Sequence, residues 1–399
     1  MKDVQRKYWW PLMGDSVTHE ERQILSEFIL NSDRLTYGRE IALFESMWSQ
    51  WNQSQFSVYV SSGTAANYLM ILSCKHYFSW LDGDEVLVPA ITWGTTISAI
   101  MNLGLRPVFV DVDLSDLSMS IEDAVKKITK KTKAIFLTHV IGLPNQVTNL
   151  FALCQEHSLQ LLEDCCESHG ATWCGEKVGN FGVASSYSFF WGHHMTTIEG
   201  GMLCLKDEGL LDIARSLRNH GLTRDMRQGD QIAQKHDLDP RFTFALPGLH
   251  CRGTETHAKL GQLQLQNLDN FIAQRNANYL IFTEMMKKHA DKITSFEPSP
   301  DAGISAYCLP FVCKDINIRA GLMDTLERNG IETRPLISGN MVRHPFVLRY
   351  LLDHGLETPI LPNANFLHDH AFYIGNSQFI SRAEIKRMES IIEEYFDGN

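Results

Sequence analysis

The chain has 399 residues, of which 44% are hydrophobic and 21% charged, a composition typical of a globular protein with a large core. Its formal net charge of −11 argues against nucleic acid as the main partner, because phosphate binding needs a basic face. No stretch is long and apolar enough for a membrane span, and MKDVQRKYWWPLMGDS (1–16) lacks the apolar core of a signal peptide.

Two amphipathic helices are predicted near the start of the chain. Thr18 and Glu21 form a capping box before the apolar run 22–30, and a second helix fits 39–51. From about residue 56, short β-rich runs alternate with helical stretches, which indicates βαβ units and a mostly parallel sheet. These strand-like runs are 56–60, 84–90, 106–113, 134–140 and 159–165. They are apolar without a period of two, as expected when helices cover both faces of the sheet.

The second half of the chain is predicted to complete this sheet and add a smaller unit. Two more strands (184–190 and 200–206) and a helix (209–221) precede a polar loop, 221–251, and one long helix, 254–290. A strand at 305–313 and helices at 319–330 and 381–396 follow. The sequence therefore predicts an α/β fold. Residues 1–290 would form a large domain with an N-terminal helical arm, and residues 291–399 a small α+β domain.

A glycine-containing turn, VSSGTAANYL (60–69), follows the first strand and opens a helix. Gly63 lets the backbone approach an anion closely, and the free N–H groups at a helix start favour negative charge. The turn could be a phosphate cradle. An ordinary helix cap explains it more simply when it is taken alone.

Two further motifs follow strands. LLEDCCESHGA (161–171) ends a strand with Glu163 and Asp164, and Glu167 comes next. Carboxylates at the carboxyl end of a parallel strand can hold a cationic ligand, or they can cap the following turn. In AITWGTTI (90–97), Trp93 could stack on a planar cofactor or serve only in packing.

A fourth motif, SYSFFWGHHMTTIEGGM (186–202), gives these three a common context. In this order the motifs resemble those of the DegT/DnrJ/EryC1/StrS family of sugar aminotransferases, which are fold-type I enzymes that use pyridoxal 5′-phosphate (PLP). The resemblance extends from YGREIALFE (37–45) through VSSGTAAN, PAITW, EDCCESHGA and IEGGM to IETRP (331–335). It implies a mixed, mostly parallel sheet with helices on both faces.

The resemblance also implies how the cofactor is held. The backbone of Gly63 and Thr64, with the Ser188 hydroxyl, would bind its phosphate. Trp93 would stack on the pyridine ring, and Asp164 would pair with the ring nitrogen, which keeps the ring an electron sink. Glu167 takes a position near the ring oxygen that is often Gln in the family.

The family's anchoring lysine is replaced by His193. No lysine lies between Lys177 and Lys206, and Lys177 matches a loop lysine of the family. PLP, or pyridoxamine 5′-phosphate (PMP), would therefore be bound without a covalent anchor. This departure resembles a small branch, the sugar 3-dehydratases, in which histidine is the catalytic base. An unperturbed pKa of about 6.5 suits histidine to that task.

For this branch the resemblance implies L-glutamate as amino donor and a nucleotide-linked 4-keto-6-deoxy sugar as substrate, with GDP-4-keto-6-deoxy-D-mannose expected. The product would be a 4-keto-3,6-dideoxy sugar for the O-antigen of lipopolysaccharide. A homodimer with shared sites is implied, in which His220 and Arg224 reach the neighbouring site and Arg224 holds a donor carboxylate. His250, before Arg252, stands where the family usually has Asn in a contact to the partner subunit.

Other functions stay open. A nucleotide-sugar 4-aminotransferase or a non-catalytic PLP-binding protein would share most of these residues. A CDP-sugar dehydrase with an iron–sulfur cluster is not expected, because loop 220–252 offers only Cys251 as a cluster ligand. A metal site is not expected, since His193 and His194 are adjacent and lack any metal-ligand spacing. Nine cysteines without a CxxC pair are typical of buried thiols in a reducing cytoplasm.

Overall fold

A seven-stranded sheet forms the centre of the protein, in a computed structural model that describes residues 8–296 and 298–397. Residues 1–7, which belong to the segment 1–16 where no signal peptide was expected, lie outside the described residues. The strand order is β1-β9-β8-β5-β4-β2-β3. The strands are β1 Phe56–Val60, β2 Glu85–Pro89, β3 Arg106–Val110, β4 Thr132–Thr138, β5 Gln160–Asp164, β8 Ala184–Ser188 and β9 Gly201–Leu205. Only β9 runs against its neighbours, so the predicted mostly parallel sheet is confirmed.

Alternate residues of each strand point into different cores, so both faces of this sheet are covered. In β2, Val86 and Val88 belong to one core and Leu87 to another. The first face packs on α3 Gly63–Tyr77, α4 Gly94–Asn102 and α7 Glu208–Arg218. The second face packs on α2 Arg39–Asn52, α5 Ile121–Lys127, α6 Val147–His157 and α9 Glu255–Leu265. This arrangement places the carboxyl ends of the parallel strands, and the starts of α3 and α4, at one edge.

The first helix begins as predicted. In α1, His19–Asn31, Thr18 and Glu21 form the reciprocal capping box. The single long helix predicted over 254–290 is wrong, because the chain turns at residues 266–267 and separates α9 from α10, Leu268–Lys287. There the N–H of Asn267 bonds to the carbonyl of Gln264, three residues back, which is a tighter turn than an α-helix allows.

A second sheet, entirely antiparallel, lies in the C-terminal part in the order β10-β12-β14-β13. Its strands are β10 Ile293–Thr294, β12 Cys308–Cys313, β13 Thr333–Pro335 and β14 Ala371–Gly375. It packs on α10, α11 Ile316–Arg328 and α14 Arg382–Asp397. A small third sheet joins β6 Thr172–Trp173, β7 Glu176–Lys177 and β11 Ala302–Gly303. The α/β fold with smaller C-terminal sheets is as predicted.

Trp10 inserts into the core of the C-terminal sheet. It pairs with Ile331, and its indole N–H donates to the carbonyl of Gly375 at 2.9 Å. The division into residues 1–290 and 291–399 stays a prediction, and this segment joins the two parts.

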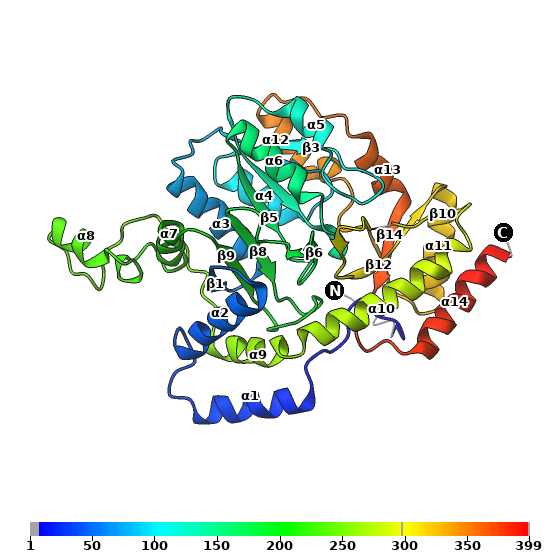
Figure 1. Cartoon of the computed structure of the whole chain (residues 1–399), viewed down its shortest axis with the longest axis horizontal. Coiled ribbons are helices and arrows are strands. Elements are labelled where there is room, and N and C mark those ends of the chain that lie inside the picture. Colours follow the sequence, from blue (N-terminus) through cyan, green and yellow to red (C-terminus); the bar gives the residue numbers. More distant parts are fainter. Residues whose placement is uncertain (1–7, 297, 398–399) are drawn as a thin grey trace.

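Several elements were missed from the sequence. The polar loop 221–251 contains η2 Thr223–Asp225 and α8 Gly229–Lys235, and α8 projects away from the body of the protein (Figure 1). Further missed elements are η1 Val140–Gly142, η3 Met341–Arg343, α12 Pro345–Asp353 and α13 Pro362–His370. Pro345 and Pro362 each occupy the first helical turn, a position that proline favours. They were therefore signals for α12 and α13.

The cysteines were predicted to be buried thiols, and in the structure all nine are free and most are buried. In the part of the chain that the structure describes, no helix combines the length and hydropathy needed to cross a bilayer.

Candidate active site

A cavity of about 410 Å³ opens at the carboxyl edge of the central sheet. Its lining includes every residue predicted to bind the cofactor, together with the predicted base: Gly63, Thr64, Trp93, Asp164, Glu167, Ser188 and His193. These side chains come from the starts of α3 and α4, from the ends of β5 and β8, and from the turn before β9. The roles assigned to them stay predictions, but the fold does bring them together.

At the start of α3, the backbone lies close to the side chain of Ser188. Ser62 caps the helix by accepting the N–H of Ala65 at 3.0 Å. A Cβ atom on Gly63 would lie 2.6 Å from Cβ of Ser188 and 3.0 Å from its Oγ, so only glycine fits there. The N-terminus of this helix and the Ser188 hydroxyl therefore face one small space, which suits an anion such as a phosphate.

Asp164 is buried at the end of β5, and three donors fix its carboxylate. Oδ2 accepts from Nδ2 of Asn67 at 2.9 Å and from Oγ1 of Thr96 at 3.0 Å. Oδ1 accepts the N–H of Cys166 at 3.1 Å. A carboxylate fixed in this way beside a cavity suits a cationic ring nitrogen. Sequence reasoning missed Asn67, although its position one turn after Gly63 was a usable signal.

Glu167 is held as a neutral acid. Burial, together with the nearby carboxylate of Asp164, raises its pKa to about 8, although the N–H of Ile141 donates to Oε2 at 2.9 Å. At neutral pH this carboxyl group therefore carries a proton that it can donate. In that state it resembles the glutamine that the family often has at this position.

His193 lies half-buried in the turn between β8 and β9. Its ring centroid is 5.4 Å from that of Tyr307, and its carbonyl accepts from Nη2 of Arg275 at 3.3 Å. Burial and the charge of Arg275 lower its pKa to about 3. The imidazole is therefore neutral at physiological pH, and its lone pair is a weaker base than the pKa of about 6.5 expected from the sequence implied.

The residues predicted to reach a neighbouring subunit do not line this cavity. The rings of His220 and His250 stack with centroids 4.9 Å apart, and Nη2 of Arg252 lies 2.9 Å from Nε2 of His250. His220 and His250 are exposed, as is Arg224 on η2. Their placement outside the chain's own site leaves them free to face another molecule.

The C-terminal sheet and the N-terminal segment supply cavity residues that the sequence did not indicate: Leu12, Met13, Tyr307, Arg334 and Tyr373. Arg334 is the only arginine or lysine among the described lining residues. Its Nη2 lies 2.7 Å from Oε1 of Glu332. The other oxygen of Glu332 accepts the N–H of Leu12 at 3.0 Å. The carboxylate of Glu332 therefore positions both the guanidinium of Arg334 and the N-terminal segment.

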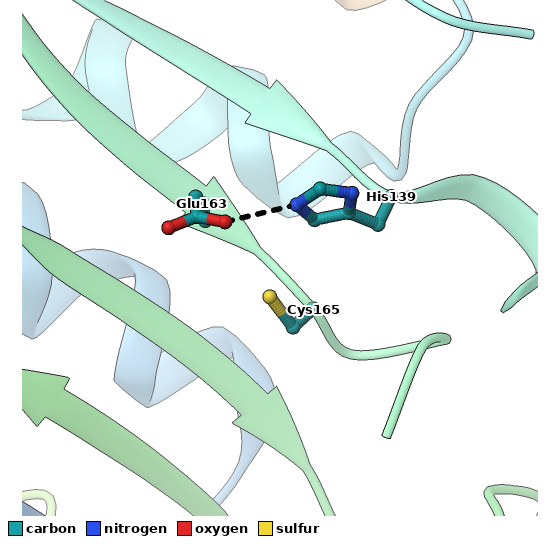
Figure 2. A group of neighbouring side chains, drawn as sticks. All are labelled: His139, Glu163 and Cys165. Carbon is teal, nitrogen blue, oxygen red and sulfur yellow. Dashed lines mark hydrogen bonds and ion pairs between the residues drawn. The ribbon is translucent and has the colours of Figure 1, made fainter. Parts of the chain in front are cut away.

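Glu163, next to Asp164, has a structural role. Figure 2 shows it with His139 and Cys165, a group close enough to consider as a metal site. Nδ1 of His139 accepts the N–H of Asn145, so Nε2 carries the proton and donates to Glu163 at 3.1 Å. The two oxygens of Glu163 also accept the N–H groups of Gly179, Phe181 and Gly182. These hydrogen bonds occupy the ligand atoms of both residues, and burial raises the pKa of the Cys165 thiol. These hydrogen bonds attach the loops around His139 and Gly179 to the end of β5, and they leave few free ligand atoms for a metal.

Comparison with known proteins agrees with this geometry. The model of the DegT/DnrJ/EryC1/StrS aminotransferase family matches residues 16–393. The chain belongs to this family. As a DegT/DnrJ/EryC1/StrS protein it has the fold-type I architecture of PLP-dependent sugar-modifying enzymes.

Relatives in the family differ in the reaction they catalyse. GDP-4-keto-6-deoxy-D-mannose 3-dehydratase of Yersinia pseudotuberculosis is 32% identical over 387 residues, which cover 95% of this chain and 97% of the relative. GDP-perosamine synthase of Vibrio cholerae is 29% identical over 395 residues, which cover 97% and 99%.

Two crystal structures of GDP-4-keto-6-deoxymannose 3-dehydratase are also similar, each with a TM-score of 0.87 and 30% identity over 96% of this chain. The match covers 100% and 99% of the respective solved chains. One is a histidine-to-asparagine mutant with bound GDP-perosamine, and the other holds a trapped PLP-glutamate geminal diamine. The helix start at Gly63, the fixed carboxylate of Asp164 and the cavity that both line fit the cofactor of this family.

Proposed function

We propose that the protein is a PLP/PMP- and glutamate-dependent 3-dehydratase that acts on a nucleotide-linked 4-keto-6-deoxy sugar. GDP-4-keto-6-deoxy-D-mannose is the proposed substrate, and a 4-keto-3,6-dideoxy sugar for O-antigen the product. The observation that carries this proposal is the position of His193. A histidine lines the cavity where other family members place their lysine, and no lysine is among the described lining residues.

The protein's residues would hold the cofactor without a covalent bond. The N–H groups of Gly63 and Thr64, with the Ser188 hydroxyl, would bind the phosphate. Trp93, more than half exposed in the single chain, would cover the ring, and Asp164 would pair with the ring nitrogen. When bound, the cofactor supplies an amine that condenses with a ketone and a ring that takes up electrons.

His193 would move the protons. Its neutral imidazole can remove a proton at C4′ of the cofactor and return one to the departing C3 hydroxyl of the sugar. Imidazole forms no stable Schiff base, so it cannot displace a bound amine as lysine does. This difference favours loss of the hydroxyl over delivery of an amino group.

Glutamate and a second subunit complete the proposed site. His220, Arg224, His250 and Arg252 would contribute to the neighbouring site of a homodimer, where Arg224 would hold a donor carboxylate. Their position outside the chain's own cavity supports this arrangement. The PLP-glutamate adduct and the GDP-sugar in related structures support the donor and the nucleotide.

The test is to incubate the protein with PLP, L-glutamate and GDP-4-keto-6-deoxymannose, and to follow the sugar by mass spectrometry. The proposal requires a product that has lost one oxygen and gained no nitrogen. His193→Asn should keep PLP binding and abolish this product, whereas His354→Asn, on the surface after α12, should retain it. Product formation near the wild-type rate by His193→Asn would refute the base assignment.

A 4-aminotransferase is the second candidate, favoured by the similarity to GDP-perosamine synthase. In the same incubation it would yield an amino sugar. A PLP-binding protein without catalysis would form no 2-oxoglutarate from glutamate.

A further inference from the structure

Arg275, in the first half of α10, is buried and donates hydrogen bonds to three separate parts of the chain. Its Nε donates to Oε1 of Gln378 at 3.2 Å, and its Nη1 donates to the carbonyl of Asn376. Nη1 also donates to the carbonyl of Tyr307 at 3.1 Å, and Nη2 donates to the carbonyl of His193 at 3.3 Å. The guanidinium therefore connects α10 and the C-terminal sheet to the turn that carries the proposed base.

Two of these carbonyls belong to residues whose rings pack together. The ring centroids of His193 and Tyr307 are 5.4 Å apart, and their planes differ by 34°. Because the guanidinium is a rigid, planar group that bonds to both backbones, it fixes the imidazole against the tyrosine ring. A lysine at this position would lack the planar fork and could not hold both carbonyls in the same way.

The charge of Arg275 has no counter-ion. Its four acceptors are neutral amide or carbonyl oxygens, and no carboxylate of the described residues forms an ion pair with it. Burial lowers its pKa only to about 10, so the group is charged at neutral pH. A buried cation without a counter-ion is unfavourable for stability, and hydrogen bonding to carbonyls alone does not require a charge.

The other titratable groups that face His193 are neutral or line the cavity. Burial lowers the pKa of His169 and His194 well below the usual value and raises that of Tyr307, so all three rings are uncharged at neutral pH. The charged or acidic residues that line the cavity with His193 are Asp164, Glu167, Glu199 and Arg334. Arg275 differs from these because its charge acts through buried protein, where electrostatic interactions are strongest.

We propose that Arg275 is a positioning residue for His193: it fixes the imidazole by holding the backbones of His193 and Tyr307, and its unpaired charge opposes a second positive charge on the ring. The inference rests on the proposed role of His193 as a base. Protonated His193 beside this charge is a strong acid. A proton taken from C4′ of the cofactor therefore passes readily to the C3 hydroxyl, which leaves as water.

The effect of the charge is tested by NMR of the full chain labelled with ¹⁵N-histidine, without added cofactor and with His193→Asn to assign the signal. We expect the wild-type His193 ring to be neutral at pH 5. The protonated fraction at pH 5 should be at least about tenfold larger in Arg275→Gln, because a nearby like charge lowers a pKa by one unit or more. Arg275→Lys keeps the charge and should stay close to the wild type.

Three results would overturn the proposal. The first is a wild-type His193 that is largely protonated at pH 5, which needs no variant to observe. The second is an equal protonated fraction in the wild type and in Arg275→Gln folded by circular dichroism. The third is the same rise in Arg275→Lys as in Arg275→Gln. These measurements do not involve glutamate or sugar, so a failure of the proposed function would be seen separately.

The placement of the imidazole is tested by the rate of conversion of glutamate to 2-oxoglutarate. Both Arg275 variants lose the planar fork, so we expect the rate at saturating glutamate to fall by at least about tenfold. The glutamate concentration for half the maximal rate should not change, because Arg275 is not among the described lining residues. Arg349→Gln, on the exposed side of α12, is the control and should match the wild type. A wild-type rate in either folded Arg275 variant would contradict the positioning role.

Discussion

Nδ2 of Asn67 donates to Oδ2 of Asp164 over 2.9 Å, and this bond joins the first turns of α3 to the last residue of β5. The same amide accepts from Oγ of Ser186 at 2.5 Å through its oxygen. One side chain thus connects the helix at the proposed phosphate site with β5 and β8, two neighbouring strands whose ends line the cavity.

Replacing Asn67 with alanine should leave the carboxylate of Asp164 held by one hydrogen-bond donor fewer. Two buried partners lose a hydrogen bond, which costs about 1–3 kcal/mol of stability. We expect PLP to bind about tenfold more weakly, because the carboxylate is no longer fixed toward the ring nitrogen. Urea unfolding and a fluorescence titration with PLP measure the two effects. Asn149→Ala, on the exposed side of α6, should change neither value.

Glu167→Gln should alter the pH dependence rather than the activity at neutral pH. The raised pKa means that, between pH 4.5 and about 8, the unfolded chain releases a proton that the folded chain keeps. The wild type therefore loses stability as the pH rises through that window, and the loss levels off above it.

Glutamine cannot ionise, so this loss should be absent in the variant, and its activity should extend to higher pH. Thermal unfolding and initial rates measured from pH 5 to pH 9 provide the check. If wild type and Glu167→Gln have parallel stability curves, Glu167 does not carry the raised pKa.

Gly63 and Gly94 form a matched pair, since each is the first residue of a helix at the cavity edge. A Cβ on Gly63 meets Ser188 at 2.6 Å, whereas the nearest atom to a Cβ on Gly94 is Cε of Met341 at 3.8 Å. We expect Gly63→Ala to lose PLP binding, because α3 or β8 must shift, and Gly94→Ala to keep it. Similar affinities for PLP in the two variants would argue against a phosphate site at Gly63.

Arg334 should bind an anionic group of a substrate. Its side chain lines the cavity and is about half exposed, its guanidinium is paired with Glu332, and it is the only guanidinium among the described lining residues. Arg334→Ala should raise KM for glutamate or for the nucleotide sugar by at least about tenfold, the usual effect of losing a charged hydrogen bond. Steady-state kinetics with each substrate varied will identify which one it contacts. Arg328→Ala, on the outer surface of α11, is the control and should leave both KM values unchanged.

Ile198 adopts a left-handed conformation, with φ of +70°, that is unfavourable for a β-branched residue. Because its side chain is 44% exposed, Ile198→Gly should lose little packing and relieve strain of about 1–2 kcal/mol, partly offset by the entropy of glycine. We expect a slightly higher midpoint of thermal unfolding, whereas Ile198→Val should give none. A lower midpoint for Ile198→Gly would indicate that the side chain contributes packing that outweighs the strain.

Most of the proposed cofactor site could be predicted because it is made by the ends of parallel strands. Asp164 and Ser188 are the last residues of β5 and β8, and Trp93 comes shortly after β2; parallel strands bring such positions to one edge whatever the loops do. The break at Asn267 was not predictable from the helical pattern alone, because both halves have helix-forming residues throughout.

The rest of the cavity depends on how a second sheet is placed against the first. Arg334 and Tyr373 are register partners on β13 and β14, and nothing in their local sequence shows that these strands face the central sheet. Two buried histidines, His169 and His194, have their Nδ1 atoms 3.2 Å apart, and this pair was missed for a related reason. Its members come from different loops, and only the fold shows that the second histidine of HHM turns away from the first.

The N-terminal segment that crosses the C-terminal sheet has a consequence for biosynthesis. Met13 and Gly375 both line the cavity, so a ribosome adding 5–20 residues per second needs roughly 20–70 s between them. Once β9 has been made, the central sheet can form while Trp10 still lacks its β14 partner. The nascent chain would thus expose the Trp10 indole, which is buried in the folded protein. Binding of that indole to another polypeptide would leave a folded central sheet with an incomplete cavity.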